Sequence, residues 1–211
     1  MPDFAQNLLS LPVMILSLTV HEWAHAFSAA RLGDDTATRQ GRLTLNPAPH
    51  IDLIGTILLP LIGVPFGWAK PVPVNPARFD RKWSMSLGMA ITAVAGPLSN
   101  LILAVICAVA LGLVYRFGYH GGAGENLLVR GLAMNVALAV FNMVPLPPLD
   151  GSRIADHFMP RGLRDAWESV MRFGPLILFG LIAFGGVILS GPIRAVSGVL
   201  VGWVYAIAGF A

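Results

Sequence analysis

A histidine-containing motif lies within the first long apolar segment of the chain, where residues 8–32 read LLSLPVMILSLTVHEWAHAFSAARL. A helix needs about 20 predominantly apolar residues to cross the hydrocarbon core of a bilayer, so this segment is long enough. Its interior nevertheless contains three ionisable side chains, His21, Glu22 and His25, in addition to Arg31 at its end. Ionisable groups at membrane depth are costly and are retained for function. We therefore expect a transmembrane helix that carries a reactive centre.

The composition of the whole chain also indicates a membrane protein. Of its 211 residues, 55% are hydrophobic and only 12% are charged, and the mean hydropathy is +0.71. A soluble domain carries about 25% charged residues. We predict an all-α, multi-pass transmembrane helical bundle that forms a single domain over residues 1–211, with a catalytic core at 8–151 and a C-terminal helical pair at 173–210. The prediction rests on six apolar segments: Leu8–Leu32, Ile51–Phe66, Leu87–Val114, Leu127–Leu146, Phe173–Leu189 and Ile193–Phe210.

Five or six of these segments are expected to span the membrane, and the second is the weakest candidate. Residues 51–66 number 16, fewer than the roughly 20 that a spanning helix needs, and they include Pro60 and Pro65. Basic residues lie on both sides of this segment, and the positive-inside rule would keep both groups in the cytoplasm. A re-entrant second segment satisfies that rule. The N-terminus then lies outside the cell membrane, and the motif at residues 21–25 lies toward the cytoplasmic side.

The net charge of +3 does not indicate a nucleic-acid partner, because the Lys and Arg residues are scattered through short loops between apolar segments. The single cysteine, Cys107, has no intrachain disulfide partner and is expected to pack or to face lipid. No Lys or Arg precedes Arg31, so we expect the first apolar segment to remain in the mature protein.

Residues 21–25, His-Glu-Trp-Ala-His, have the HExxH pattern. Histidines at i and i+4 share one helical face, where both imidazoles can bind one zinc ion. Glu22 lies beside them and can act as the general base on a water that the zinc activates. The alternative is a set of ordinary polar residues at a helix end, which the cost of burying three ionisable groups in a membrane disfavours.

A catalytic zinc usually has three protein ligands and an open fourth position. Asp150 is the leading candidate for the third ligand. It lies in the segment 142–151, NMVPLPPLDG, where three prolines prevent a regular helix and Gly151 permits a tight turn. Irregular backbone at membrane depth must face protein or water. A carboxylate at an interfacial turn is the alternative, and the HExxH motif favours metal binding.

With these two motifs the sequence resembles the site-2 protease family of intramembrane zinc metalloproteases, particularly its short bacterial members without extra domains. The resemblance covers about residues 8–151 and includes HExxH, the NxxPxxxLDG pattern and the segment 45–56, LNPAPHIDLIGT. It implies that one Zn²⁺ ion is bound by His21, His25 and Asp150, and that Glu22 is the catalytic base.

Several other residues are candidates to support this centre. Small and polar residues recur every fourth position in the third segment, which favours close helix packing; they are Gly88, Thr92, Gly96, Asn100, Ala104, Ala108 and Gly112. Asn100 lies in a GPxxN sequence that also resembles the family, so it either packs or supports the active site. Asn135 and Asn142 share a helix face; an interhelical hydrogen bond is one reading, and the resemblance favours substrate binding by Asn142. His50 either lies at the mouth of the site or is an interfacial histidine without a catalytic role.

The segment 67–75, GWAKPVPVN, contains two prolines and alternates in polarity, which suits an edge strand or an extended loop. Such an edge can receive a substrate strand, and similar proteins have a membrane-associated sheet here. We expect a short interfacial β hairpin, with a loop anchored by Trp68 and Trp83 as the alternative.

The combined interpretation is an intramembrane zinc metalloprotease that cleaves membrane-protein substrates, most simply single-pass helices, within or beside the lipid bilayer. One rival is a proteolytically inactive zinc-binding membrane scaffold, which the presence of Glu22 disfavours. A metal transporter would need polar donors across several helices or inverted repeats, and the sequence shows neither.

Overall fold

The computed structural model describes residues 4–64 and 67–210, and every regular element within them is helical, as expected for the all-α class. The long helices are α1 (Phe4–Arg31), α4 (Met85–Arg116), α5 (Ala123–Asn142), α7 (Arg164–Ile188) and α8 (Ser190–Ala208). The short helices are α2 (Thr36–Arg39), α3 (Leu59–Leu61) and α6 (Asp150–Phe158), with single helical turns at Ala48–His50, Pro76–Arg78 and Arg161–Leu163.

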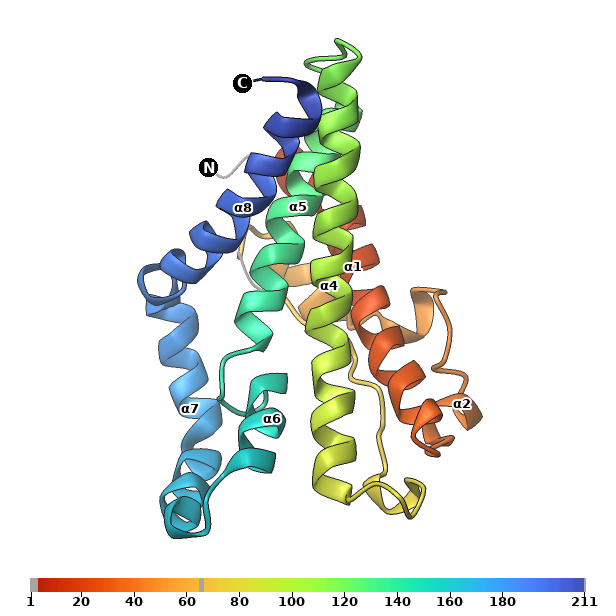
Figure 1. The fold of residues 1–211 in the computed structure, drawn as a ribbon, viewed down its shortest axis with the longest axis vertical. Helices are drawn as coiled ribbons and strands as arrows, with labels where there is room; N and C mark the ends of the chain where they lie inside the picture. Colours follow the sequence, from red (N-terminus) through yellow and green to blue (C-terminus); the bar gives the residue numbers. More distant parts are fainter. Residues whose placement is uncertain (1–3, 65–66, 211) are drawn as a thin grey trace.

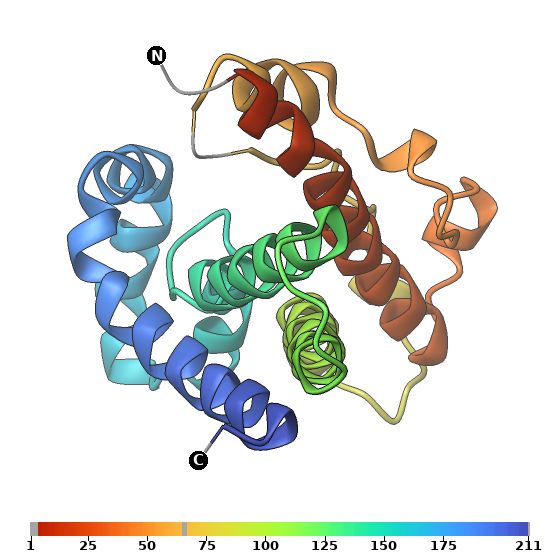
Figure 2. The same cartoon turned by 90° about the horizontal axis from the view of Figure 1, so that it is seen from above.

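Helix α4 runs along the long axis of the molecule and forms its centre (Figure 1). Helices α1 and α5 pack against it, and α8 packs against α4 and α5 from the opposite side to α1 (Figure 2). The largest apolar core joins α4, α5 and α8; its buried members are Ala104, Ala108, Leu111, Leu132, Val136, Leu200 and Val204. Several buried polar side chains lie on α1 and α4 instead, among them Ser17, His21, Thr92 and Asn100.

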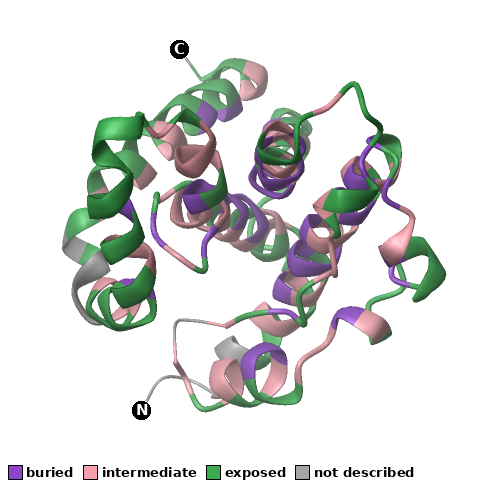
Figure 3. Ribbon diagram, turned by 90° about the horizontal axis from the view of Figure 1, so that it is seen from below, coloured by how far each residue is buried: buried purple, intermediate pink, exposed green. Residues whose placement is uncertain are grey.

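The two faces of α4 have opposite compositions. All seven small or polar residues predicted to form a packing stripe, from Gly88 to Gly112, are buried, which confirms that prediction. The large apolar residues on the remaining surface of the helix are exposed; they include Leu98, Ile102, Ile106, Val109 and Leu113. Buried positions of the central helices face one another across the molecule, while the outer turns are exposed (Figure 3). Large apolar side chains outside and small ones inside are typical of a helix that lipid surrounds.

Within the described residues, three helices are long and apolar enough to cross a membrane: α4, α5 and α8. These are fewer than the five or six spans expected, and α1 is not among them; it carries the polar motif at residues 21–25 and an internal proline, Pro12. Proline is tolerated in membrane helices when neighbouring groups satisfy the freed carbonyl. The sequence therefore places a reactive motif on a helix that packs against an evident membrane helix.

The second apolar segment does not form a spanning helix. Its helical part comprises a π-helix at Leu53–Leu58 and the short α3, together about 14 Å at 1.5 Å per residue. The chain then returns, because the Thr56 hydroxyl donates to the Trp68 carbonyl at 2.7 Å and the Trp68 N–H donates to the Gly55 carbonyl at 3.3 Å. This geometry agrees with the re-entrant prediction for residues 51–64; residues 65 and 66 lie outside the described part of the chain.

The two C-terminal helices that we expected over residues 173–210 are present as α7 and α8. They do not form a hairpin: α8 continues beyond α7 in the same overall direction, so the end of α8 and the start of α1 lie at the same end of the molecule (Figure 1). The reason is the connection: only Leu189 separates the two helices, and its φ of −87° and ψ of −13° are close to helical. One residue in this conformation cannot reverse the chain.

The expected β hairpin is also absent from the residues that the structure describes. Residues 70–75, which we call the strap, have no regular secondary structure and no strand partner. Pro71 and Pro73 have no N–H to donate, and the Lys70 N–H already donates to the His50 carbonyl at 2.9 Å. The strap is thus an extended loop, which was the second form that its sequence allowed.

Candidate metal centre

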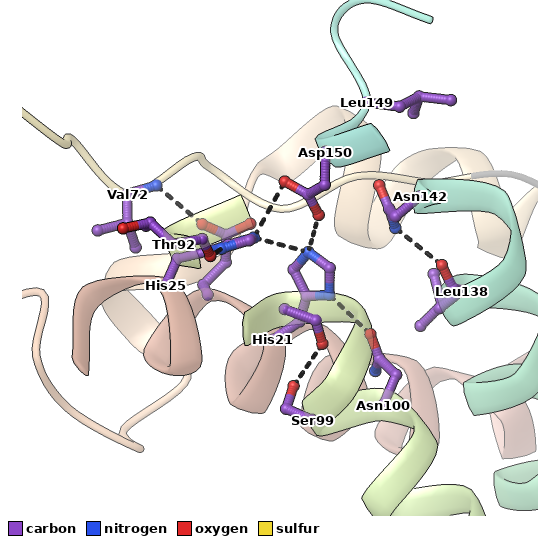
Figure 4. Close-up of polar contacts among 12 residues, drawn as sticks. His21, His25, Val72, Thr92, Ser99, Asn100, Leu138, Asn142, Leu149 and Asp150 are labelled. Carbon is purple, nitrogen blue, oxygen red and sulfur yellow. Dashed lines mark hydrogen bonds and ion pairs between the residues drawn. The ribbon is translucent and has the colours of Figure 1, made fainter. Parts of the chain in front are cut away.

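Three side chains from distant parts of the sequence meet between α1, α4 and α6. The Nε2 atoms of His21 and His25 are 3.0 Å apart. The carboxylate of Asp150 lies 3.2 Å from His21 Nε2 through Oδ2, and 3.3 Å from His25 Nε2 through Oδ1 (Figure 4). These three residues form a group that could hold one metal ion. The three ligands predicted from the sequence are therefore brought together.

Asp150 reaches the histidines because an irregular segment ends beside them. The chain leaves α5 at Asn142, runs through three prolines and re-enters a helix at Asp150, the first residue of α6. A Cβ on Gly151 would collide with the carbonyl oxygens of Met143 and Val144. Glycine is thus required by the close approach of the backbone, and the tight turn that we expected at Gly151 is not the reason.

The outer nitrogens of both imidazoles are hydrogen-bonded away from the centre. His21 Nδ1 lies 2.6 Å from Asn100 Oδ1, and His25 Nδ1 lies 2.7 Å from the Thr92 carbonyl oxygen. Carbonyl oxygens only accept hydrogen bonds, so each Nδ1 must carry the proton. In the neutral imidazole, each Nε2 then has the lone pair that points to the centre, which is the state that binds a metal.

The orientation of the Asn100 amide is itself fixed. Its Nδ2 donates to Asn135 Oδ1 at 2.8 Å and to the Ser17 carbonyl at 3.3 Å, so Oδ1 must be the atom that faces His21. Asn135 Nδ2 in turn donates to the Gly131 carbonyl at 2.8 Å. This confirms the interhelical hydrogen bond foreseen for Asn135. The amide network links α1, α4 and α5, and it sets the proton position on one ligand.

Gly96 allows α4 to approach the two histidines. A Cβ at this position would lie 2.5 Å from His25 Nε2 and 2.6 Å from His21 Nε2. Neither imidazole can move outward without breaking its bond to α4 at Asn100 or Thr92. The glycine in the predicted stripe is therefore part of the wall of the metal centre.

The residues fit a zinc ion. A tetrahedral zinc with ligand bonds of about 2.1 Å holds neighbouring ligand atoms about 3.4 Å apart, a few tenths of an ångström more than the three observed separations. Asp150 Oδ2 is buried without a hydrogen-bond partner although it lies beside His21 Nε2. With both imidazoles neutral, two lone pairs and a carboxylate oxygen at such distances would repel one another, and a divalent cation between them would replace that repulsion with three bonds.

Glu22 lies next to His21 on α1, and its Oε2 accepts a hydrogen bond from the Val72 N–H of the strap at 2.8 Å. No signal in the sequence could have identified this donor, because every residue except proline has a backbone N–H. The Thr92 carbonyl was missed for the same reason.

The remaining candidates occupy less direct positions. Asn142 lies near Asp150 in Figure 4, but its Nδ2 donates to the Leu138 carbonyl of its own helix at 3.0 Å. His50 is 1% exposed, and its Nε2 lies 2.9 Å from the Thr44 carbonyl. The structure does not place His50 in the metal-binding group, and its described contacts tie the loop after α2 to the strap.

Comparisons with known proteins point the same way. Over 173 residues the chain is 42% identical to "Putative zinc metalloprotease YwhC" of Bacillus subtilis, an alignment that covers 80% of this chain and 77% of the relative. It is 32% identical over 171 residues to "Putative zinc metalloprotease Rip2" of Mycolicibacterium smegmatis, covering 80% of this chain and 64% of the relative. Rip2 of Mycobacterium tuberculosis (strain Erdman) is 29% identical over 179 residues. No family model and no solved structure matches the chain.

Proposed function

We propose, from the premise that this chain belongs to the site-2 protease family of zinc metalloproteases, that it hydrolyses peptide bonds of membrane-protein substrates within or beside the bilayer. One observation carries the proposal. Two imidazole lone pairs and a carboxylate converge on one point among helices with lipid-type surfaces, beside the carboxylate of Glu22. Three ligands leave a position for water, which distinguishes a catalytic zinc site from a closed structural one.

The chain's own groups have distinct roles in the proposed reaction. When bound, zinc would lower the pKa of the attacking water and polarise the scissile carbonyl. Glu22 takes the proton of that water and passes it to the departing amide nitrogen. Asn100 and the Thr92 carbonyl hold the two imidazoles in place during the reaction.

Asn142 is the candidate donor to the oxyanion. One hydrogen of its Nδ2 donates to the Leu138 carbonyl, which holds the side chain in place, and the second hydrogen can donate to a substrate oxyanion.

The proposed substrate is a single-pass membrane helix that unwinds near the centre. A helix hides its carbonyls in its own hydrogen bonds, so a segment must become extended before cleavage. We propose that the protein lies in the cell membrane, with α1, α4 and α5 crossing it and α7 and α8 completing the bundle. The N-terminus is outside and the metal centre is toward the cytoplasm, because the loops after α1 and α5 carry most of the basic residues.

The test is cleavage of a single-pass membrane protein by the purified full chain in lipid bilayers, with zinc present and after chelation. The proposal expects zinc-dependent cleavage by the wild type and none by Glu22→Gln, which should still bind zinc. Cleavage that persists in Glu22→Gln would contradict the assigned base. Zinc binding without cleavage of any membrane substrate would favour the scaffold instead.

A further inference from the structure

The strap passes beside the metal centre, and its Val72 N–H donates to Glu22 Oε2 at 2.8 Å (Figure 4). We propose that this backbone N–H positions the Glu22 carboxylate for proton transfer. The proposal rests on the proposed function, since it assigns an orienting partner to the base of that reaction. It makes Val72 a positioning residue that acts through its main chain.

The bond restrains a flexible side chain at its far end. Glutamate has three rotatable bonds, and α1 fixes only the first atom of the side chain. A charge-assisted hydrogen bond to one carboxylate oxygen fixes the other end. Because the bond uses Oε2, Oε1 stays available to receive a proton. A base held in one orientation needs less reorganisation as the proton moves.

The strap is suited to this task because its own position is fixed on both sides of Val72. Before it, the Lys70 N–H donates to the His50 carbonyl at 2.9 Å. After it, the Asn75 N–H donates at 2.6 Å to Oδ2 of Asp34, a carboxylate with no exposed surface. The two flanking prolines fix their φ angles and have no N–H. Among residues 71–73, Val72 thus has the sole N–H that can point to Glu22.

A buried charge also secures the strap. Arg42 is 7% exposed, and its Nη2 lies 2.5 Å from the Lys70 carbonyl oxygen and 3.3 Å from the Pro71 carbonyl oxygen. Burying a guanidinium is costly unless its donors are used, so this arrangement holds the two carbonyls next to Val72 in place. Both polar groups of the peptide unit between Pro71 and Val72 are therefore held: the Pro71 carbonyl by Arg42, and the Val72 N–H by Glu22.

The decisive comparison is Val72→Pro with Val72→Ala. Proline removes the N–H, keeps three side-chain carbons and suits an extended residue that already precedes a proline, whereas alanine keeps the N–H and removes both methyl groups of valine. The loss in Val72→Ala therefore reports the side chain alone. We expect Val72→Pro to lower kcat about 10- to 100-fold more than Val72→Ala, with KM and zinc affinity alike in the two.

Three outcomes would overturn the proposal: equal kcat in the two variants, a kcat raised by proline, or a loss confined to zinc affinity. A raised kcat would mean that the strap blocks Glu22. The double variant adds a check, because Glu22→Asp ends one methylene short of the strap. In that background Val72→Pro should reduce the residual kcat less than twofold, and a full further loss would contradict the proposal.

A second variant serves as the control for misfolding of Val72→Pro. If Val72→Pro does not accumulate, Arg42→Gln loosens the same strap without a change of backbone, and it should lower kcat several-fold at full zinc occupancy; an unchanged kcat would overturn the proposal. Failure of the proposed function looks different, because then the wild type itself shows no zinc-dependent cleavage.

Discussion

The inner face of α4 meets two different neighbours along its length. From Thr92 to Asn100 it faces α1 and the metal centre, and from Ala104 to Gly112 it faces α5 and α8. Both halves consist of small residues at the same spacing. In the first half they make room for imidazoles and supply their hydrogen-bond partners, and in the second half they let apolar helices approach. One sequence pattern thus serves a reactive site at one end and packing at the other.

The largest expected effect concerns the ligands themselves. His21→Ala or Asp150→Ala should lower zinc affinity by more than about 100-fold, since loss of a direct ligand should exceed the 10- to 100-fold typical of its supporting partners. Metal content of the purified protein after dialysis against a weak chelator measures this. The assignment of three ligands fails for any of them whose removal leaves stoichiometric zinc.

Gly96→Ala and Gly112→Ala compare the two halves of α4 directly. A Cβ at Gly96 would lie 2.5 Å from His25 Nε2, so the variant should lose most zinc affinity and activity. A Cβ at Gly112 would lie 2.8 Å from Ile207 Cβ, in the apolar half. That variant should keep its zinc and lose about 1–3 kcal/mol of stability through overpacking. Zinc affinity and thermal unfolding are measured for both, and similar zinc losses would refute the division.

The amide network should show a graded effect within the first half of α4. Asn100→Ala removes the acceptor of the His21 Nδ1 proton and should weaken zinc binding about 10- to 100-fold. Asn135→Ala acts only through the orientation of Asn100 and should cost less. Asn100→Asp keeps an acceptor and should recover part of the affinity. Competition with a chromogenic chelator gives the order, and a larger effect for Asn135 than for Asn100 would contradict it.

The sequence predicted the parts of this centre that side chains determine. The i, i+4 spacing of His21 and His25 and the proline-rich approach to Asp150 predicted three side chains that do meet in a group able to hold a metal ion. The partners supplied by the backbone were not predictable: the Thr92 carbonyl and the Val72 N–H belong to groups that nearly every residue has. The course of α7 into α8 was missed for a related reason. Hydropathy marks two apolar segments, but the conformation of Leu189 decides whether the chain turns between them.

The smallest expected effect lies on the outer face of α4. Ile106 is 55% exposed there, and Leu132 of α5 is 6% exposed in the apolar core. Ile106→Ala should cost less than about 1 kcal/mol in a bilayer, because acyl chains fill the space that the side chain leaves. Leu132→Ala leaves a cavity and should cost about 2–5 kcal/mol. Unfolding in lipid bicelles compares the two variants at equal zinc occupancy. Equal losses of stability would mean that protein, rather than lipid, covers the outer face of α4. The exposed apolar residues on that face would then no longer be evidence that α4 crosses a membrane.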